Sequence, residues 1–276
     1  MDFSPNADHE AIREGIRRVC ADFPDEYWAK KDADHEFPWD FYDKLAEGGW
    51  VGMAIPTEYG GGGQGITEAS IMLEEIAASG AAMNGCSAVH LSVFGMEPVR
   101  KYGSPELAAE VLPRVAAGEL HVAFGVTEPD AGTDTTQIKT RAVRDGDEYV
   151  INGAKVWTTK APYCEMCLLL VRTTPIEECE SRTDGISLFL VDLQDPAVDI
   201  TPIPKLGRNA VVSCEVRYDN LRVPASRRIG DEGKGFRYIL DGLNPERVLI
   251  ASEALGIGRA SIRRATDYAK ERIIFN

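Results

Sequence analysis

The chain has 276 residues, of which 44% are hydrophobic and 27% charged, and its formal net charge is -14. This composition is typical of a soluble globular protein, and the length predicts two or three packed units. The acidic excess argues against a general binder of nucleic acids or anionic membranes, because both kinds of binding depend on basic patches.

The sequence shows no clear targeting signal and no cysteine pattern typical of a disulfide framework or a metal site. It contains no run of about 18 apolar residues, and "MDFSPNADHEAIREG" is acidic where a signal peptide would be basic, so we expect a cytoplasmic protein. The six cysteines are scattered, which favours reduced thiols. Cys164 and Cys167 form a C-x-x-C without a second pair of ligands and lead into the apolar run "CLLLVR". Core packing is therefore favoured over a metal or redox site.

Residues 1–120 have the pattern of a helical domain. Apolar positions spaced by four, three and four residues share one helix face, namely Ile12, Ile16, Val19 and Phe23. Ser104 and Pro105 are typical of the first turn of another helix, which closes near Gly118. The stretch "YGGGGQG" lacks the Lys-Ser/Thr of a P-loop and any strand before it, so it predicts a flexible connection and no phosphate site.

Residues 121–232 change to short apolar runs separated by turns. Asp145-Gly146 lies between two β-type runs, a strong hairpin signal, and Asn152-Gly153 repeats that signal a few residues later. No helix alternates with these runs, so a Rossmann sheet is disfavoured. The spacing predicts a central antiparallel β-barrel or sandwich.

Residues 233–276 return to a helical pattern, in which Asn244-Pro245 is the one turn cluster. The apolar positions cover more than one face, so these helices need neighbours on several sides. The chain ends before any further helix, and we expect most of a C-terminal helical bundle to be missing. The predicted fold class is α+β in three domains.

Six strings in this order resemble the acyl-CoA dehydrogenase family along the whole chain. They are "GGWVGMAIPTEYGG", "VTEPDAGTD", "YVINGAKVWTT", "LRVP" with "GDEGKGF", "NPER" and "ERIIF". One such string is weak support, but six in the family's order are specific. The resemblance implies an N-terminal helical domain, a middle β-domain, a C-terminal helical domain and a role in fatty acid β-oxidation.

The resemblance also implies an FAD site around "FGVTEPDAGTD". Taken alone, this stretch is equally typical of a charged surface turn. In the family, the strand matching Phe124 to Thr127 follows the edge of the flavin ring, which here implicates Phe124, Val126 and Thr127. Thr133 stands where the family usually has serine, and it is implied at the cofactor and the substrate.

Two residues of "KVWTTK" complete the implied flavin environment. The residue matching Trp157 packs on the flavin, and the one matching Thr159 bonds near its reactive nitrogen. Spacing alone favours a core aromatic and an ordinary strand residue. Lys160 departs from the small polar residue that is commoner there, and it either alters the flavin environment or points outward.

The family's reaction removes an α-proton and a β-hydride from an acyl-CoA thioester, so a carboxylate must act as base. In the isovaleryl and long-chain branches this base lies at the position of Glu246, which we take as the candidate, with Arg247 at the substrate. A base from the region beyond residue 276 is the alternative. Sequence alone favours a solvated Glu246–Arg247 surface pair.

The last helix implies assembly with other chains. Arg272 and Phe275 match a motif that reaches the FAD of a neighbouring subunit, which implies a dimer or tetramer. The resemblance further implies electron transfer to an electron-transfer flavoprotein. Two other hypotheses are an oxygen-using oxidase or monooxygenase and an inactive partner subunit. His90 could line the substrate pocket, although an ordinary interior or surface histidine is the simpler interpretation.

Overall fold

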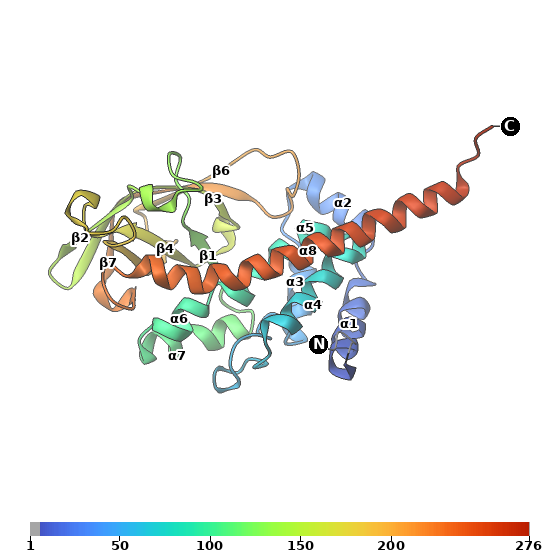
Figure 1. Cartoon of the computed structure of the whole chain (residues 1–276), viewed down its shortest axis with the longest axis horizontal. Helices are drawn as coiled ribbons and strands as arrows, with labels where there is room; N and C mark the ends of the chain where they lie inside the picture. The colour runs from blue at the N-terminus through green and yellow to red at the C-terminus, as the bar shows by residue number, and fades with distance from the viewer. Residues whose placement is uncertain (1–5, 276) are drawn as a thin grey trace.

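The computed structural model describes residues 6–275, so residues 1–5 at the start of the predicted first domain, and Asn276, lie outside it. Helices occupy one end of the molecule and a β-sheet the other, as the coloured trace in Figure 1 shows. One long C-terminal helix begins beside the sheet, contacts both parts and extends beyond the helical end. The three-part order predicted from the sequence is confirmed.

The N-terminal region consists of helices packed around an aromatic core. Its α-helices are α1 (Ala7–Cys20), α2 (Asp25–Asp34), α3 (Trp39–Glu47), α4 (Ile66–Ile76), α5 (Ala82–Phe94), α6 (Glu97–Tyr102) and α7 (Pro105–Ala116). The N-cap predicted for α7 is confirmed, because the Ser104 hydroxyl accepts a hydrogen bond from the Leu107 amide at 3.2 Å. Every residue of α5 from Gly85 to Phe94 is buried, so this helix lies at the centre of the region.

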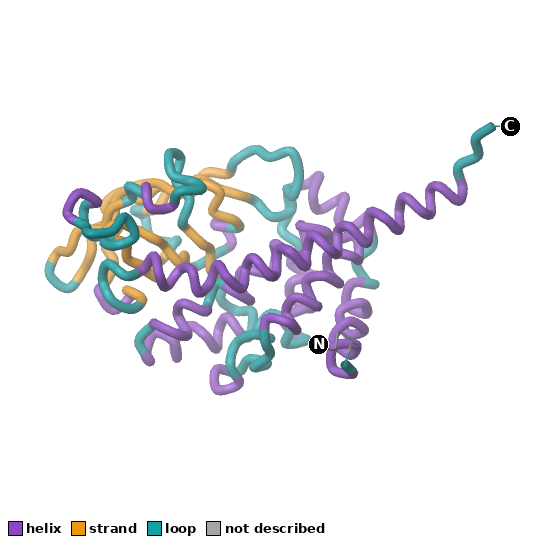
Figure 2. The backbone as a smooth tube through the Cα atoms, viewed as in Figure 1, coloured by secondary structure: helices purple, strands orange, loops and turns teal. Residues whose placement is uncertain are grey.

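The middle region is a single sheet of eight strands. They are β1 (Val122–Gly125), β2 (Arg141–Asp145), β3 (Glu148–Thr159), β4 (Met166–Arg172), β5 (Ile186–Asp192), β6 (Val198–Pro202), β7 (Ser213–Pro224) and β8 (Arg228–Ile229). The order is β6-β7-β3-β2-β4-β5-β8, with β1 paired to β4. Figure 2 shows these strands gathered at one end of the molecule.

Strand direction corrects the predicted all-antiparallel barrel or sandwich. β1 and β2 both pair with β4 in parallel, and the other pairs are antiparallel, so the sheet is mixed. β1 follows α7 and is not part of a hairpin. The chain passes through β2 and β3 before it forms β4. Such a long connection permits parallel pairing, whereas a short apolar run carries no sign of its direction.

The two predicted hairpin turns have different outcomes. Asp145 pairs with Glu148 across the first turn, which confirms that hairpin. The second prediction is wrong, because β3 continues through Asn152-Gly153 with a register shift against β7. Gly153 has φ +147°, and a Cβ at this position would lie 2.6 Å from the Thr140 hydroxyl. Here the glycine serves a bulge and a close approach.

The C-terminal region is the helix α8 (Gly235–Glu271), which Pro245 does not interrupt. It packs on β5, α6, α5 and α4 in turn, and Arg259 still bonds Glu74 and Glu75 on α4. Only its last turns extend away from the body of the molecule (Figure 1). Leu255, Ile262 and Tyr268 are exposed apolar side chains on the second half of the helix. The turn suggested by Asn244-Pro245 is absent because packing on both sides holds the helix together across the proline.

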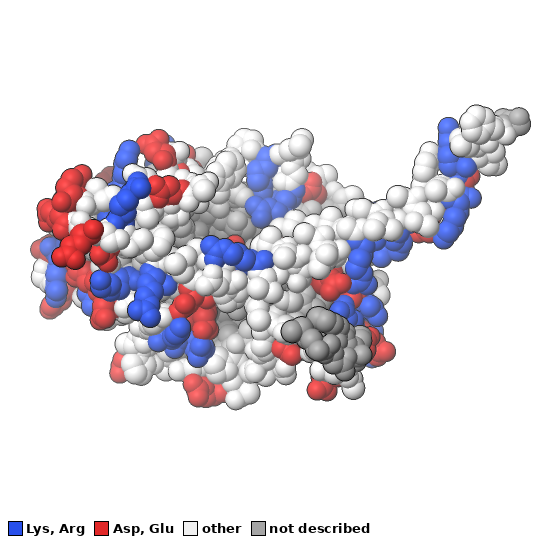
Figure 3. All heavy atoms as spheres, viewed as in Figure 1, with Lys and Arg blue, Asp and Glu red and all other residues white. Residues whose placement is uncertain are grey.

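Charged side chains lie on the surface, and the two cysteines of the C-x-x-C lie in the core. Figure 3 shows acidic and basic side chains mixed over the visible face, with basic side chains along the distal half of α8. Cys164 and Cys167 are buried free thiols, as expected for core residues, and residues 6–275 contain no group of acidic, cysteine and histidine side chains suited to a metal. Among these residues no helix has the length and apolarity needed to cross a bilayer.

Candidate active site

The three regions meet around a cavity of about 360 Å³. Strands β1 and β3 form one wall of the cavity, the β-wall, and helices α5 and α8 form the other, the helical wall. Six of the predicted site residues line it, namely Phe124, Val126, Thr127, Trp157, Thr159 and Glu246. Residues more than a hundred positions apart in the sequence thus line one cavity.

A buried ion pair fixes the end of β1 against β3. The Lys155 ammonium donates to the Glu128 carboxylate at 2.8 Å and to the Val126 carbonyl at 3.0 Å. The Val156 amide donates to the Thr127 carbonyl at 2.9 Å. Because Lys155 and Glu128 are almost completely buried, these bonds set the positions of Val126 and Thr127 on the cavity wall.

Glu128 is fully engaged as a hydrogen-bond acceptor. In addition to Lys155, it accepts from the Lys139 amide at 2.6 Å and from the Thr140 amide at 3.0 Å. Burial by itself raises the pKa of this carboxyl, but Lys155 and the backbone donors outweigh that effect and lower it below its usual range. Glu128 is therefore an ionised structural group that closes the turn after Thr127.

Trp157 enters the cavity through an irregularity of β3. The register against β7 shifts between Lys155 and Thr158, and Trp157 has φ +61°. Its side chain is 56% exposed although the residues on either side of the bulge are packed. A left-handed conformation costs a bulky residue about 1 kcal/mol or more, and such strain is concentrated at functional sites. The core position favoured by spacing alone is wrong for this tryptophan.

The helical wall presents Glu246 without a partner. Leu243, Glu246 and Ile250 are spaced by three and four residues, so they lie on one face of α8 toward the cavity. No hydrogen bond or ion pair of the Glu246 carboxylate occurs within residues 6–275. Burial raises the pKa of Glu246 and nearby Glu253 adds to the rise, whereas His90 and Arg247 oppose it.

The surface pair of Glu246 and Arg247 favoured by sequence alone does not form. The Arg247 guanidinium donates instead to the Asn244 side-chain oxygen at 2.5 Å, and Arg247 is exposed. Successive residues of a helix point about 100° apart, so one of them faces the cavity while its neighbour faces solvent.

Three other predicted site residues lie away from the cavity within this chain. Thr133 is exposed on the loop after β1, and Thr135, two residues later, lines the cavity. Arg272 and Phe275 follow the distal end of α8, roughly 40 Å along the helix axis from Glu246 at 1.5 Å per residue. Figure 1 shows this end of the chain projecting into solvent.

Lys160 does not point outward, so that alternative is wrong. Its side chain is fully buried, and the ammonium donates to the Ala88 carbonyl at 3.2 Å. Lys160 lies at the end of β3 in a left-handed conformation, which turns it behind the cavity wall toward α5. Burial lowers its pKa, as expected for an ammonium far from water.

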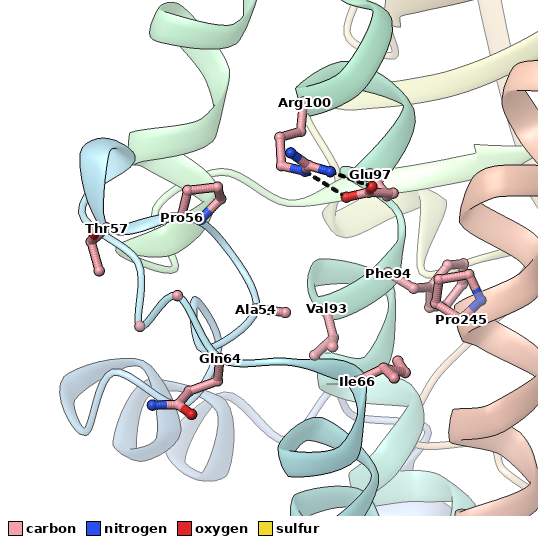
Figure 4. A pocket seen from close by; sticks show the side chains of 12 residues that line it. Ala54, Pro56, Thr57, Gln64, Ile66, Val93, Phe94, Glu97, Arg100 and Pro245 are labelled. Carbon is pink, nitrogen blue, oxygen red and sulfur yellow. Dashed lines mark hydrogen bonds and ion pairs between the residues drawn. The ribbon is translucent and has the colours of Figure 1, made fainter.

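A second cavity of about 530 Å³ adjoins the first. Figure 4 shows Thr57 and Gln64 on one side, Ile66, Phe94 and Pro245 on the other, and the Arg100–Glu97 ion pair near its rim. Phe94 lines both cavities, and Pro245 lines the second where its neighbour Glu246 lines the first. Phe94 is thus the partition between the two spaces.

Comparison with known families accounts for all three regions in order. The N-terminal, middle and C-terminal domains of acyl-CoA dehydrogenase match residues 6–119, 123–221 and 233–276. The chain belongs to the acyl-CoA dehydrogenase family. It is accordingly an oxidoreductase, and the resemblance inferred from the six sequence strings is confirmed.

Individual acyl-CoA dehydrogenases and related structures give the same result. Acyl-CoA dehydrogenase fadE12 of Mycobacterium bovis is 32% identical over 99% of this chain and 69% of its own length. A glutaryl-coenzyme A dehydrogenase in complex with glutaryl-CoA has a TM-score of 0.91 and 28% identity, covering 100% of this chain and 71% of that one. A structure described as an electron transferring flavoprotein of Acidaminococcus fermentans has a TM-score of 0.90 and 27% identity over 100% of this chain and 71% of that chain.

Of two further groups in this cavity, Arg208 was not predicted from the sequence and His90 was considered only as one of two interpretations. Arg208 lines it from the loop before β7, and His90 lines it while its Nδ1 is 3.0 Å from the buried Glu253 carboxylate. Glu253 is 163 positions away from His90 in the sequence. The only signal in the sequence was that His90 and Glu253 each lie within a largely apolar helical stretch. Their pairing depends on tertiary packing.

Proposed function

We propose that this protein dehydrogenates an acyl-CoA thioester between the α and β carbons, with FAD as cofactor and Glu246 as the base. The observation that supports this most directly is the shared cavity. It brings an unpartnered carboxylate on α8 into the same space as the hydroxyls and indole of the β-wall. The domain limits that we propose for this activity are residues 1–120, 121–232 and 233–276.

The residues present fit a flavin. The β-wall offers a strained, half-exposed indole face, and the hydroxyls of Thr127, Thr135 and Thr159 line the same space. A planar heterocycle with a polar rim needs this combination of an apolar face and hydrogen-bonding groups at its edge. We assign Phe124, Val126, Thr127, Trp157 and Thr159 to the ring, and Thr133 to the adjoining cofactor and thioester groups. When bound, FAD supplies the acceptor for the hydride that leaves the β-carbon.

Glu246 has the chemistry that the proton-transfer step requires. Its carboxylate removes the α-proton, so the electron pair of the broken C–H bond forms the new double bond as the β-hydrogen departs. A carboxylate with no hydrogen-bond donor and a raised pKa is a stronger base than one in water. The apolar side chains of Leu243 and Ile250 flank it on the same face of α8 and line the same cavity.

Arg247 and the end of α8 have proposed roles outside the cavity. We place the exposed Arg247 guanidinium, steadied by Asn244, at the polar part of the coenzyme A ester. Exposed apolar side chains on the distal half of α8 support contact with a second copy in a dimer or tetramer. In that assembly Arg272 and Phe275 are proposed to reach the partner's FAD.

The electron acceptor separates the main proposal from its alternatives. We propose an electron-transfer flavoprotein as the partner that reoxidises the cofactor. An oxidase or monooxygenase of the same fold would consume oxygen instead. The inactive-subunit hypothesis is less well supported, because an inactive site would have no need of an unpartnered, desolvated carboxylate in its cavity.

The test is an anaerobic titration of the purified flavoprotein with straight and branched acyl-CoA esters, followed by flavin absorption. Wild-type protein is expected to bleach, and Glu246→Gln is expected to lose about a hundredfold to ten-thousandfold in the rate of bleaching while keeping its flavin. Glu271→Gln, an exposed carboxyl on the same helix, is the matched control and should behave as the wild type.

Other outcomes of this titration select among the alternatives. Equal bleaching of wild type and Glu246→Gln would move the base to a residue outside this chain. Bleaching followed by rapid recovery on admission of air, with oxygen consumed stoichiometrically, would favour the oxidase. Purified protein without flavin that also gains none from added FAD would favour the partner subunit.

A further inference from the structure

Arg208 is a cation in the proposed active-site cavity that has no anionic partner. Its guanidinium donates to the Ser87 hydroxyl at 3.1 Å and to the Ser213 hydroxyl at 3.1 Å. None of the ion pairs among residues 6–275 includes it. A guanidinium has five N–H donors, so two neutral hydroxyls leave most of its hydrogen-bonding capacity and all of its charge uncompensated.

The loop that carries Arg208 is held in a strained shape. Arg208 has φ +60°, which is unfavourable for a residue with a long side chain. Lys205 donates to the Arg208 carbonyl at 2.8 Å and to the Val211 carbonyl at 2.7 Å, and the Asn209 amide donates to the Asp32 carboxylate at 2.5 Å. These three bonds fix the loop on both sides of Arg208 and direct its side chain inward. Strain that is maintained by specific anchors is a mark of a functional position.

The partners of Arg208 place it on the acyl side of the cavity. Ser87 lies on α5 one turn before His90 and Leu91, which line the helical wall together with Glu246. In the proposed site, an acyl chain whose α-carbon is next to Glu246 runs along this helical wall. Ser213 pairs with Thr159 across β3 and β7, so Arg208 bridges the helical wall and the strands where the two walls meet.

Glu253, the acidic residue whose charge acts on Arg208, does not form an ion pair with it. The Glu253 carboxylate contacts His90 Nδ1 at 3.0 Å and affects Arg208 only beyond ion-pair distance. Burial lowers the pKa of the Arg208 guanidinium, and the more distant Glu253 opposes that effect only in part. A desolvated cation of this kind is stabilised by an anion that arrives with the ligand.

We propose that Arg208 is a specificity-determining residue that binds a carboxylate at the far end of the substrate's acyl chain, so that the preferred substrates are CoA esters of dicarboxylic acids. The guanidinium fork matches a carboxylate in a bidentate arrangement, and Ser87 and Ser213 hold the fork in place. This inference rests on the proposed acyl-CoA dehydrogenation.

The test compares adipyl-CoA with hexanoyl-CoA, which have the same number of acyl carbons and differ in the terminal carboxylate. Wild-type flavoprotein is expected to have the higher kcat/KM with adipyl-CoA and to bind it more tightly in calorimetry. Arg208→Gln should lower the ratio of kcat/KM for adipyl-CoA to kcat/KM for hexanoyl-CoA by about a hundredfold. Arg208→Lys should retain part of the preference, because it keeps the charge and loses the fork.

Arg217→Gln is the matched control, since Arg217 is an exposed arginine on the strand that follows the same loop. Equal use of both esters by the wild type, or equal losses for both in Arg208→Gln, would overturn the inference. Loss of flavin from Arg208→Gln would overturn it too, by assigning Arg208 to the cofactor. If no acyl-CoA reduces the flavin, the proposed function fails; if hexanoyl-CoA reduces it without any preference for adipyl-CoA, only this inference fails.

Discussion

The turn after β1 and the middle of α8 each place a glutamate near the same cavity, and the two carboxylates have opposite surroundings. Glu128 accepts hydrogen bonds from Lys155 and from two backbone amides, and its pKa falls. Glu246 accepts none from the described residues, and its pKa rises. The residue type is the same, so the difference comes from the donors that each region supplies.

This contrast separates structural from chemical roles for the two carboxylates. A carboxylate whose lone pairs are occupied is stable and ionised, but it has no capacity to take a proton from a substrate. A carboxylate without donors is unstable when charged and gains by accepting a proton. The β-wall therefore uses Glu128 to hold its shape, and the helical wall keeps Glu246 available for chemistry.

The largest effect that would test this contrast is on stability, through Glu128→Gln. The variant leaves the Lys155 ammonium buried without its counter-charge, and we expect a loss of about 3–5 kcal/mol in the free energy of unfolding. Denaturant unfolding measures it. Replacing Lys155 by Met in the same protein should restore much of the loss, because no unpaired charge then remains. A single variant as stable as the wild type would show that the pair is not closed in solution.

The second prediction concerns the pH dependence of that pair. Because the pKa of Glu128 is lowered in the folded protein, its contribution to stability is fully present above its ordinary pKa of 4.5 and is lost as the pH falls through the folded value. The wild type should therefore lose more unfolding free energy below pH 4.5 than the Glu128→Gln, Lys155→Met double variant does. Parallel pH profiles for the two proteins would contradict the assignment.

The smallest expected effect is on the stability of Glu246→Gln. The raised pKa means that the folded protein holds this proton more tightly than the unfolded chain, so ionisation of Glu246 destabilises the fold as the pH rises above 4.5. At neutral pH the variant should be more stable than the wild type, by up to about 1 kcal/mol. Thermal unfolding at neutral and acidic pH checks the sign. A variant that is less stable at neutral pH would indicate a donor to Glu246 that the contrast leaves out.

Much of the architecture followed from local patterns in the sequence. The face formed by Ile12 and Ile16, the Ser104 cap and the Asp145-Gly146 hairpin all depend on residues close in sequence, and the structure contains each of them. The parallel pairing of β1 with β4 and the bulge at Gly153 were not predictable in this way. Strand direction and bulges depend on which distant segment supplies the neighbouring hydrogen bonds.

The same distinction between local sequence and tertiary contacts applies to the candidate site. By itself the sequence determined the order of the three regions and the strings that pointed to Phe124, Val126, Thr127, Trp157, Thr159 and Glu246, because those depend on residue identity and spacing. Tertiary structure decided that Glu246 faces the cavity without a donor, that Glu128 is paired with Lys155, and that Arg208 enters the cavity unpaired. The physical reason is that burial, charge compensation and pKa are set by neighbours from other parts of the chain.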